Sequence, residues 1–202
     1  MRACSRLVYL GFFAIVATVL GWSAPAAAAD NVDEAMILVA KPALRDRLYG
    51  ATVLVVKPIG NNQHMGFIVN KPTRMTLAKL FPDHVPSRKV TEPVYLGGPV
   101  NTEILFALVQ RGDSPGKSSL QIAPDLFLAH ERDVVDRIIE TEADHARFFA
   151  GLVLWRPGEL NAEIKQGYWY VQDANTELVL PKSTEGMWEG LVRELEIKAK
   201  AI

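Results

Sequence analysis

The chain has 202 residues with 22 Lys and Arg, 23 Asp and Glu, and a formal net charge of −1. This length predicts one folded domain with a substantial core, and the charge lacks the basic excess typical of nucleic-acid-binding proteins. The single cysteine, Cys4, excludes an intramolecular disulfide and lies before the first apolar run, where no lipid-attachment site would be.

The first 29 residues have the three parts of a secretory signal peptide. Arg2 and Arg6 give a positive start, residues 7–22 carry no charge, and an alanine-rich stretch with an A-x-A site ends at Ala29. We therefore expect cleavage after Ala29, a mature protein that begins at Asp30, and a periplasmic or secreted location. The alternative is a retained membrane anchor, but the apolar run of about 16 residues is shorter than the ~20 that a spanning helix needs. After cleavage, residues 30–202 would carry a net charge of −3, no cysteine and no stable membrane insertion.

Short apolar runs, many of them rich in β-branched residues, predict strands along the rest of the chain. These runs are residues 36–40, 51–57, 66–70, 94–96, 104–109, 126–129, 147–155 and 168–172. The stretch from Pro58 to Asn62 between the second and third run has turn chemistry, so we expect these two runs to form a hairpin.

Apolar residues recur at helical spacing in two segments, residues 131–142 and 183–197, and shorter helices are expected at 76–81 and 159–166. Strands outnumber helices and do not alternate with them regularly. The pattern therefore predicts an α+β fold with a mixed or mostly antiparallel sheet, not a doubly wound parallel one.

Two catalytic motifs are present only in part. Residues 112–116 match the G-x-S-x-G pattern of hydrolases, but Ser114 is followed by Pro115, which has no N–H to line an oxyanion hole. Gly116-Lys117-Ser118 is similar to the end of a P-loop, but that pattern needs glycine where Arg111 stands. We expect a polar turn here, with no nucleophile and no phosphate site.

The four histidines, His64, His84, His130 and His145, lie far apart, and none has a partner at zinc-ligand spacing. Each is expected to be a solvated surface side chain. No metal and no cofactor are predicted for this chain.

Three stretches place glycine, proline and polar residues at the end of an apolar run. The first ends at Asn70 before Lys71-Pro72, the second turns through Gly97-Gly98-Pro99, and the third passes from Trp155 through Gly158 into a helix that begins with Glu159. An acidic residue in the first helical turn suits the helix dipole, and adjacent glycines allow positive φ or close backbone approach. These corners either shape the fold alone or meet in a shared cleft. In the second case the candidate binding residues are Asn70, Gly97, Gly98, Pro99, Trp155, Gly158, Glu159 and Glu163.

These stretches, in this order, resemble the YqgE/AlgH family of bacterial proteins. The resemblance covers essentially the whole chain after the expected signal peptide, and its first two motifs match well at residues 66–72 and 95–100. In the third, this chain has Glu159-Leu160-Asn161 where the family pattern has Gln-Leu-Glu, while Glu163 keeps the later acidic position.

The resemblance implies an α+β fold in which a bent mixed or antiparallel sheet forms a pseudo-barrel flanked by a few helices. It implies no defined reaction, and some members carry a transcriptional-regulator label. Residues 30–202 show no helix-turn-helix pattern and no basic stripe, so we expect no nucleic-acid binding.

The leading hypothesis is an exported, non-enzymatic binding or interaction module with an unknown protein or small-molecule partner. One alternative is a hydrolase-like enzyme of unrecognised type that uses carboxylates such as Glu159 and Glu163, which are spaced to share one helix face. The other is a regulator, as the family label suggests.

Overall fold

The protein folds around one curled sheet of ten strands, and the computed structural model describes residues 34–200 of it. The expected signal peptide and its cleavage site lie outside the described residues. The strands are β1 Met36–Ala40, β2 Val53–Pro58, β3 His64–Ile68, β4 Pro72–Thr76, β5 Pro93–Leu96, β6 Val100–Gln110, β7 Leu120–Ala123, β8 Leu126–Ala129, β9 Ala146–Trp155 and β10 Trp169–Asp173. The helices are α1 Leu77–Leu80, α2 Arg132–Thr141, α3 Glu159–Lys165, α4 Thr176–Val179 and α5 Met187–Lys200, with short 3-10 turns η1 Val85–Lys89 and η2 Ala143–His145.

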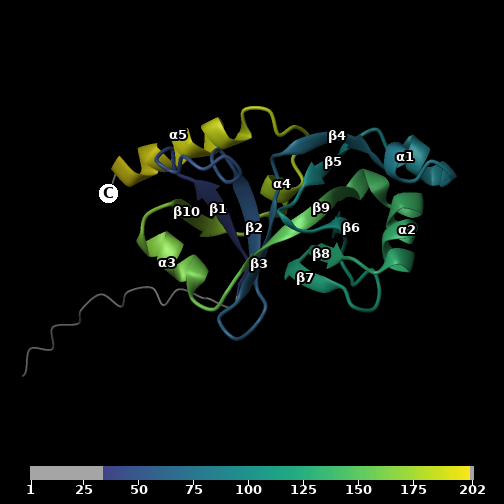
Figure 1. The fold of residues 1–202 in the computed structure, drawn as a ribbon, viewed down its shortest axis with the longest axis horizontal. Coiled ribbons are helices and arrows are strands. Elements are labelled where there is room, and N and C mark those ends of the chain that lie inside the picture. The colour runs from purple at the N-terminus through teal and green to yellow at the C-terminus, as the bar shows by residue number, and fades with distance from the viewer. Residues whose placement is uncertain (1–33, 201–202) are drawn as a thin grey trace, which may run out of the picture. The chain divides into compact units, whose positions relative to one another are not determined.

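The order of the strands confirms the predicted mixed, mostly antiparallel sheet. They follow the sequence β10-β1-β2-β3-β9-β6-β8-β7, with β4 joined to β5 and β5 joined to β9 (Figure 1). Only the β5–β9 pair is parallel among the described strands. The predicted hairpin is also present, because Leu54 of β2 lies opposite Ile68 of β3, and its turn places Asn61 and Asn62 at positive φ.

Among the strands and α-helices, β4, β7 and α4 were not predicted from the sequence. Strand β4 pairs only with β5, and three of its five side chains are exposed, so it has no apolar run to detect. Strand β7 has four residues at the edge of the sheet. Strand β6 begins at Val100, four residues before the predicted start. The first half of the strand is mostly exposed, so it has no apolar run that would have revealed it.

The inner face of the curl holds the largest core cluster. Phe67 lies at its centre, with ring centroids 5.3 Å from Phe106 and 5.6 Å from Phe149. Such aromatic pairs contribute about 0.5–1.5 kcal/mol each beyond the burial of their area. Helix α5 covers this face through Leu191 and Val192, and it lies over β1 and β10 in Figure 1.

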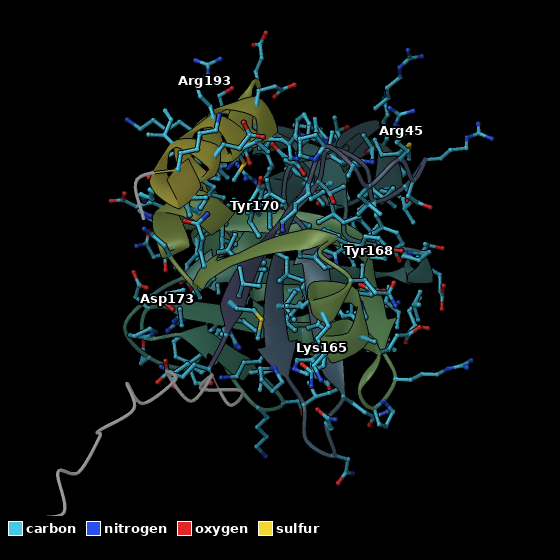
Figure 2. All side chains as sticks on the ribbon, turned by 90° about the vertical axis from the view of Figure 1, so that its left-hand side faces the viewer. Arg45, Lys165, Tyr168, Tyr170, Asp173 and Arg193 are labelled. Carbon is cyan, nitrogen blue, oxygen red and sulfur yellow. The ribbon has the colours of Figure 1, made fainter. Side chains whose placement is uncertain are left out.

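The outer face carries two separate clusters. One lies beneath α2 and includes Ile138 and Phe148. The other includes Trp155 of β9, Leu160 of α3 and Trp169 of β10. In Figure 2, β10 runs between α5 on one side and α3 on the other. Because both faces of the central strands are covered, these strands are almost continuously apolar and were detectable from the sequence. No helix within residues 34–200 has the length and apolar character needed to cross a bilayer.

The glycine pair after β5 permits a close backbone approach, one of the two reasons that the sequence suggested for it. A Cβ on Gly98 would lie 2.2 Å from the carbonyl carbon of Leu152, and a Cβ on Gly97 would lie 2.2 Å from the Gly151 oxygen. Neither glycine of the pair has a positive φ. Steric contact with the backbone of β9 therefore requires glycine here.

We predict that Gly98→Ala destabilises the protein by roughly 3 kcal/mol, because its methyl group would overlap backbone atoms that cannot rotate away. For a domain of this size, that loss lowers the melting temperature by roughly 6–12 °C. The matched control is Gly190→Ala in α5, where an added Cβ meets no atom within 4 Å. Thermal unfolding of both variants tests this, and equal melting temperatures would show that the close approach does not constrain the fold.

Candidate functional site

The first two corners meet each other and are filled by backbone contacts. Ile68 N–H donates to the Gly97 carbonyl at 2.9 Å. The Asn70 side chain accepts from Val53 N–H at 2.9 Å and donates to the Ala51 carbonyl at 3.0 Å. Pro99 is exposed. The structure thus brings Asn70, Gly97, Gly98 and Pro99 into one region of the fold, where Asn70 and the glycines hold strands together.

The third corner forms the predicted strand–turn–helix unit. Strand β9 ends at Trp155, and Gly158 takes a φ of 79° as the N-cap of α3. Its N–H donates to the Asn62 carbonyl at 3.1 Å. The Glu159 carboxylate accepts from Arg156 N–H at 2.9 Å, which fixes the turn before the helix.

A single carboxylate oxygen joins this corner to β10. Oε2 of Glu163 accepts from the indole N–H of Trp155 at 3.1 Å and from that of Trp169 at 2.8 Å. The two indoles are only 4% and 5% exposed. A buried indole N–H needs an acceptor, so Glu163 satisfies both rings with one atom.

These side chains line a cavity of about 270 Å³, which we call the indole pocket. It contains three of the candidate residues from the sequence, Trp155, Glu159 and Glu163. Sequence reasoning missed the remaining lining residues, which are Leu44, Asp46, Tyr49, Val153, Leu154, Tyr168 and Trp169. The aromatic run Tyr168–Tyr170 was the available signal, but it was interpreted only as part of a strand.

The loop between β1 and β2 forms one wall of the indole pocket and is held by hydrogen bonds within the loop and by one from Lys71. The Asp46 carboxylate accepts from Leu48 N–H at 2.7 Å and from Tyr49 N–H at 2.8 Å. These two backbone hydrogen bonds, that of Tyr49 first, lower the pKa of Asp46. Lys71, next to Asn70 in the first corner, donates from Nζ to the Leu48 carbonyl. Burial lowers the pKa of Lys71, and the nearby Asp46 charge opposes that shift. The first corner therefore contributes to the pocket by supporting its wall.

The charged side chains that line the indole pocket are all acidic. Burial raises the pKa of Tyr49, and the Glu163, Asp46 and Glu159 charges raise it further. No Lys, Arg or His is among the described residues that line the pocket, and the Lys71 charge behind the loop acts on Asp46.

A larger hollow of about 500 Å³ lies around the start of β9. Its deepest cation, Arg147, donates to the Val179 carbonyl at 3.1 Å and to the Pro181 carbonyl at 2.6 Å, and its guanidinium lies 4.5 Å from the centre of the Tyr95 ring. Arg147 thus fastens the segment between α4 and α5 to the sheet. The rim carries both signs of charge, from Lys89, Lys182, Glu92, Glu140 and Asp144, so this hollow favours no single ligand chemistry.

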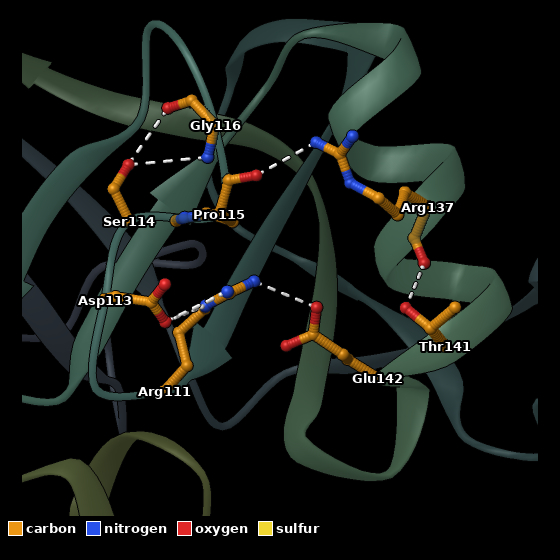
Figure 3. Close-up of polar contacts among 8 residues, drawn as sticks. All are labelled: Arg111, Asp113, Ser114, Pro115, Gly116, Arg137, Thr141 and Glu142. Carbon is orange, nitrogen blue, oxygen red and sulfur yellow. Dashed lines mark hydrogen bonds and ion pairs between the residues drawn. The ribbon is translucent and has the colours of Figure 1, made fainter.

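The incomplete hydrolase motif forms a polar turn, as predicted. The Ser114 hydroxyl donates to the Gly116 carbonyl at 3.0 Å, and Arg137 of α2 donates to the Pro115 carbonyl at 2.9 Å (Figure 3). Arg111 binds Asp113 and Glu142 across the same turn. Within residues 34–200, no three His, Cys, Asp or Glu side chains gather closely enough to hold a metal ion.

Comparison with known proteins establishes the family. The family model described as AlgH-like matches residues 37–200. The chain belongs to the AlgH-like family. The predicted family resemblance is therefore confirmed.

Relatives of this AlgH-like protein carry names that assign no activity. A UPF0301 protein from Chlorobaculum tepidum is 31% identical over 160 residues, which is 78% of this chain and 83% of that protein. One from Parabacteroides distasonis is 30% identical over 162 residues, which is 79% of this chain and 81% of that protein.

Two solved structures share the fold. The solution structure of the AlgH protein from Pseudomonas aeruginosa has a TM-score of 0.67 at 23% identity and covers 87% of this chain and 93% of its own. A crystal structure of a Corynebacterium diphtheriae protein has a TM-score of 0.66 at 22% identity, with 79% and 85% covered. These similarities confirm the α+β architecture.

The prediction that His64 is a solvated surface side chain is wrong. His64 is 1% exposed and begins β3, opposite Trp155 of β9. Neither of its ring nitrogens has a hydrogen-bond partner among the described residues. The polar residues before it suggested a loop, but the hairpin ladder already includes His64 and the neighbouring strand end buries it. His130 and His145 are exposed as predicted, whereas His84 is half-buried and lies 2.7 Å from the Ser87 hydroxyl.

Burial lowers the pKa of His64, and this shift makes stability depend on pH. Below about pH 6.5 the His64 side chain of the unfolded state takes up a proton, whereas that of the folded state resists protonation. The contribution of neutral His64 to stability is therefore complete above that pH and is lost as the pH falls below it. We predict that the free energy of unfolding falls between pH 7 and pH 5, by at most about 1.4 kcal/mol per pH unit for this group. His64→Leu should reduce the fall, whereas His145→Leu at an exposed position should not. Equal pH slopes in wild type and His64→Leu, measured by urea unfolding, would contradict this.

Proposed function

We propose that this AlgH-like protein is a non-enzymatic binding module that takes a small group of its ligand into the indole pocket. The observation that carries the proposal is the pocket itself. Tyr49, Trp155 and Trp169 line a defined cavity, and Glu163 is held against it by two indole N–H groups. Aromatic walls with a few fixed polar groups are typical of ligand sites.

A carboxylate-based hydrolase is the second candidate, because Glu159 and Glu163 line the same pocket. The hydrogen bonds favour binding over catalysis. Glu159 accepts from the backbone of its own turn, and Glu163 accepts from two rings. Both carboxylates are thus fixed by protein donors, whereas an acid–base pair must exchange protons with a substrate.

We predict that small fragments bind at the indole pocket and that Leu154→Trp abolishes this binding. Leu154 lines the pocket but is 46% exposed, so a larger side chain there can close the pocket without disturbing the core. The matched control is Val171→Trp on β10, which is also 46% exposed and lies outside the pocket. Saturation-transfer NMR with a fragment set of mixed charge makes the comparison. Spectra recorded over hours would also detect hydrolysis of bound fragments, and turnover that Glu163→Gln abolishes would favour the enzyme.

A screen without hits on the wild type would overturn the binding proposal. The binding proposal would also fail if the same fragments bound the Leu154→Trp variant with unchanged affinity.

We also propose that the protein acts outside the cytoplasm after removal of residues 1–29, on the basis of the charge and apolar pattern of that segment. The expected N-terminus of protein isolated from the native cell is Asp30. Intact-mass analysis of soluble and membrane fractions measures this directly. Full-length protein that begins at Met1 in the membrane fraction would instead identify a retained anchor, and in the cytoplasm it would rule out export.

A further inference from the structure

The lining of the indole pocket limits the chemistry of its ligand, and the following inference rests on the binding function proposed above. The first limit comes from hydrogen bonding. Both indole N–H groups of the pocket are already bound to Oε2 of Glu163. Within residues 34–200, the other Glu163 oxygen, Oε1, accepts no hydrogen bond from the protein. Apart from the hydroxyls of Tyr49 and Tyr168, the side-chain polar atoms that remain are carboxylate oxygens, which only accept, so the ligand has to supply most of the donors.

The second limit comes from charge. Asp46, Glu159 and Glu163 line the pocket, and no cationic side chain lies among the described lining residues. Burial is the main cause of the raised pKa of Tyr49, and the Glu163, Asp46 and Glu159 charges add to it. Lys71 offsets part of the Asp46 charge, whereas neither Glu159 nor Glu163 forms an ion pair with a described residue. The pocket therefore favours a cation over a neutral ligand or an anion.

The third limit comes from the walls and the size. Tyr49 and Tyr168 are partly accessible, and together with the buried indoles they give the cavity an aromatic lining. Aromatic rings attract cations in addition to apolar chains. The cavity of about 270 Å³ lies just below the range of about 300–1,000 Å³ that holds drug-sized ligands. It is therefore suited to one side-chain-sized group.

We propose that the group bound in the indole pocket is an alkylammonium, from a free amine or from a lysine side chain of a peptide. Its apolar chain would contact the aromatic walls, and its three N–H donors would meet Glu159 and Glu163. No bond is made or broken in this step.

The test uses the indole N–H signals of ¹⁵N-labelled protein expressed from the full-length sequence. Trp155 and Trp169 report on the pocket, whereas Trp188 donates its N–H to the Ala40 carbonyl and does not line the pocket, so it is an internal control. Butylammonium should shift the first two signals saturably, with a Kd on the order of 1–10 mM for so small a ligand, and leave Trp188 unmoved. Butanol and butyrate at equal concentration and ionic strength should bind at least about tenfold more weakly.

Two variants test the charge and not the shape. Glu159→Gln and Glu163→Gln should each weaken butylammonium binding about tenfold, while Gln retains an oxygen that can accept the existing hydrogen bonds. The matched control is Glu189→Gln, because Glu189 lies in the first turn of α5 as Glu159 does in α3, but outside the pocket. If Glu163→Gln unfolds, Glu159→Gln still decides, since Glu159 is exposed.

A peptide arm separates the two sources of the cation. Nα-acetyl-lysine methylamide that binds at least as well as butylammonium supports a lysine side chain, and weaker binding supports a free amine. Butanol or butyrate that shifts the Trp155 and Trp169 signals as strongly would overturn the cation and leave the pocket as a binding site. Unmoved signals with every probe would also overturn the cation, and the fragment screen would then decide whether the pocket binds at all.

Discussion

The close approach of Gly97 and Gly98 to β9 is the constraint on which the rest of the fold depends. Gly97 accepts from Ile68 N–H and donates to the Ala150 carbonyl, each at 2.9 Å, so it lies between β3 and β9. These two strands pair directly only at one end, from His64 to Gly66. Beyond that point β5 separates them and pairs in parallel with β9. The sheet therefore opens and curls, and β9 pairs with β3 near its C-terminal end and with β5 before that point.

This arrangement explains why the indole pocket lies where it does. The start of β9 is covered by α2, and its end is covered only by the short helix α3 and the loop between β1 and β2. Two large rings, Trp155 and Trp169, are buried beneath that cover. The cavity is the part they leave open, and Lys71 and Asp46 keep the loop wall in place beside it.

Local sequence patterns were sufficient for the central strands, for α2 and α5, and for the turn into α3. Each of these depends on apolar periodicity or on turn residues within a few positions. The pocket could be predicted only in part, because Tyr49 and Trp155 are more than a hundred residues apart and nothing local connects them. The prediction that His64 is a surface side chain failed for the same reason. Its burial follows from pairing with β9, not from the polar residues beside it.

The charge of Glu163 is the feature of the site that packing does not explain. Two buried indole N–H groups need an acceptor with two free lone pairs, and the amide oxygen of a glutamine has them. A carboxylate is more costly to withdraw from water than an amide, and Asp46 and Glu159 line the same pocket. Hydrogen bonding to the two indoles alone therefore does not require a charge at this position. The proposed alkylammonium would use that charge, since Oε1 of Glu163 accepts no hydrogen bond from the described residues.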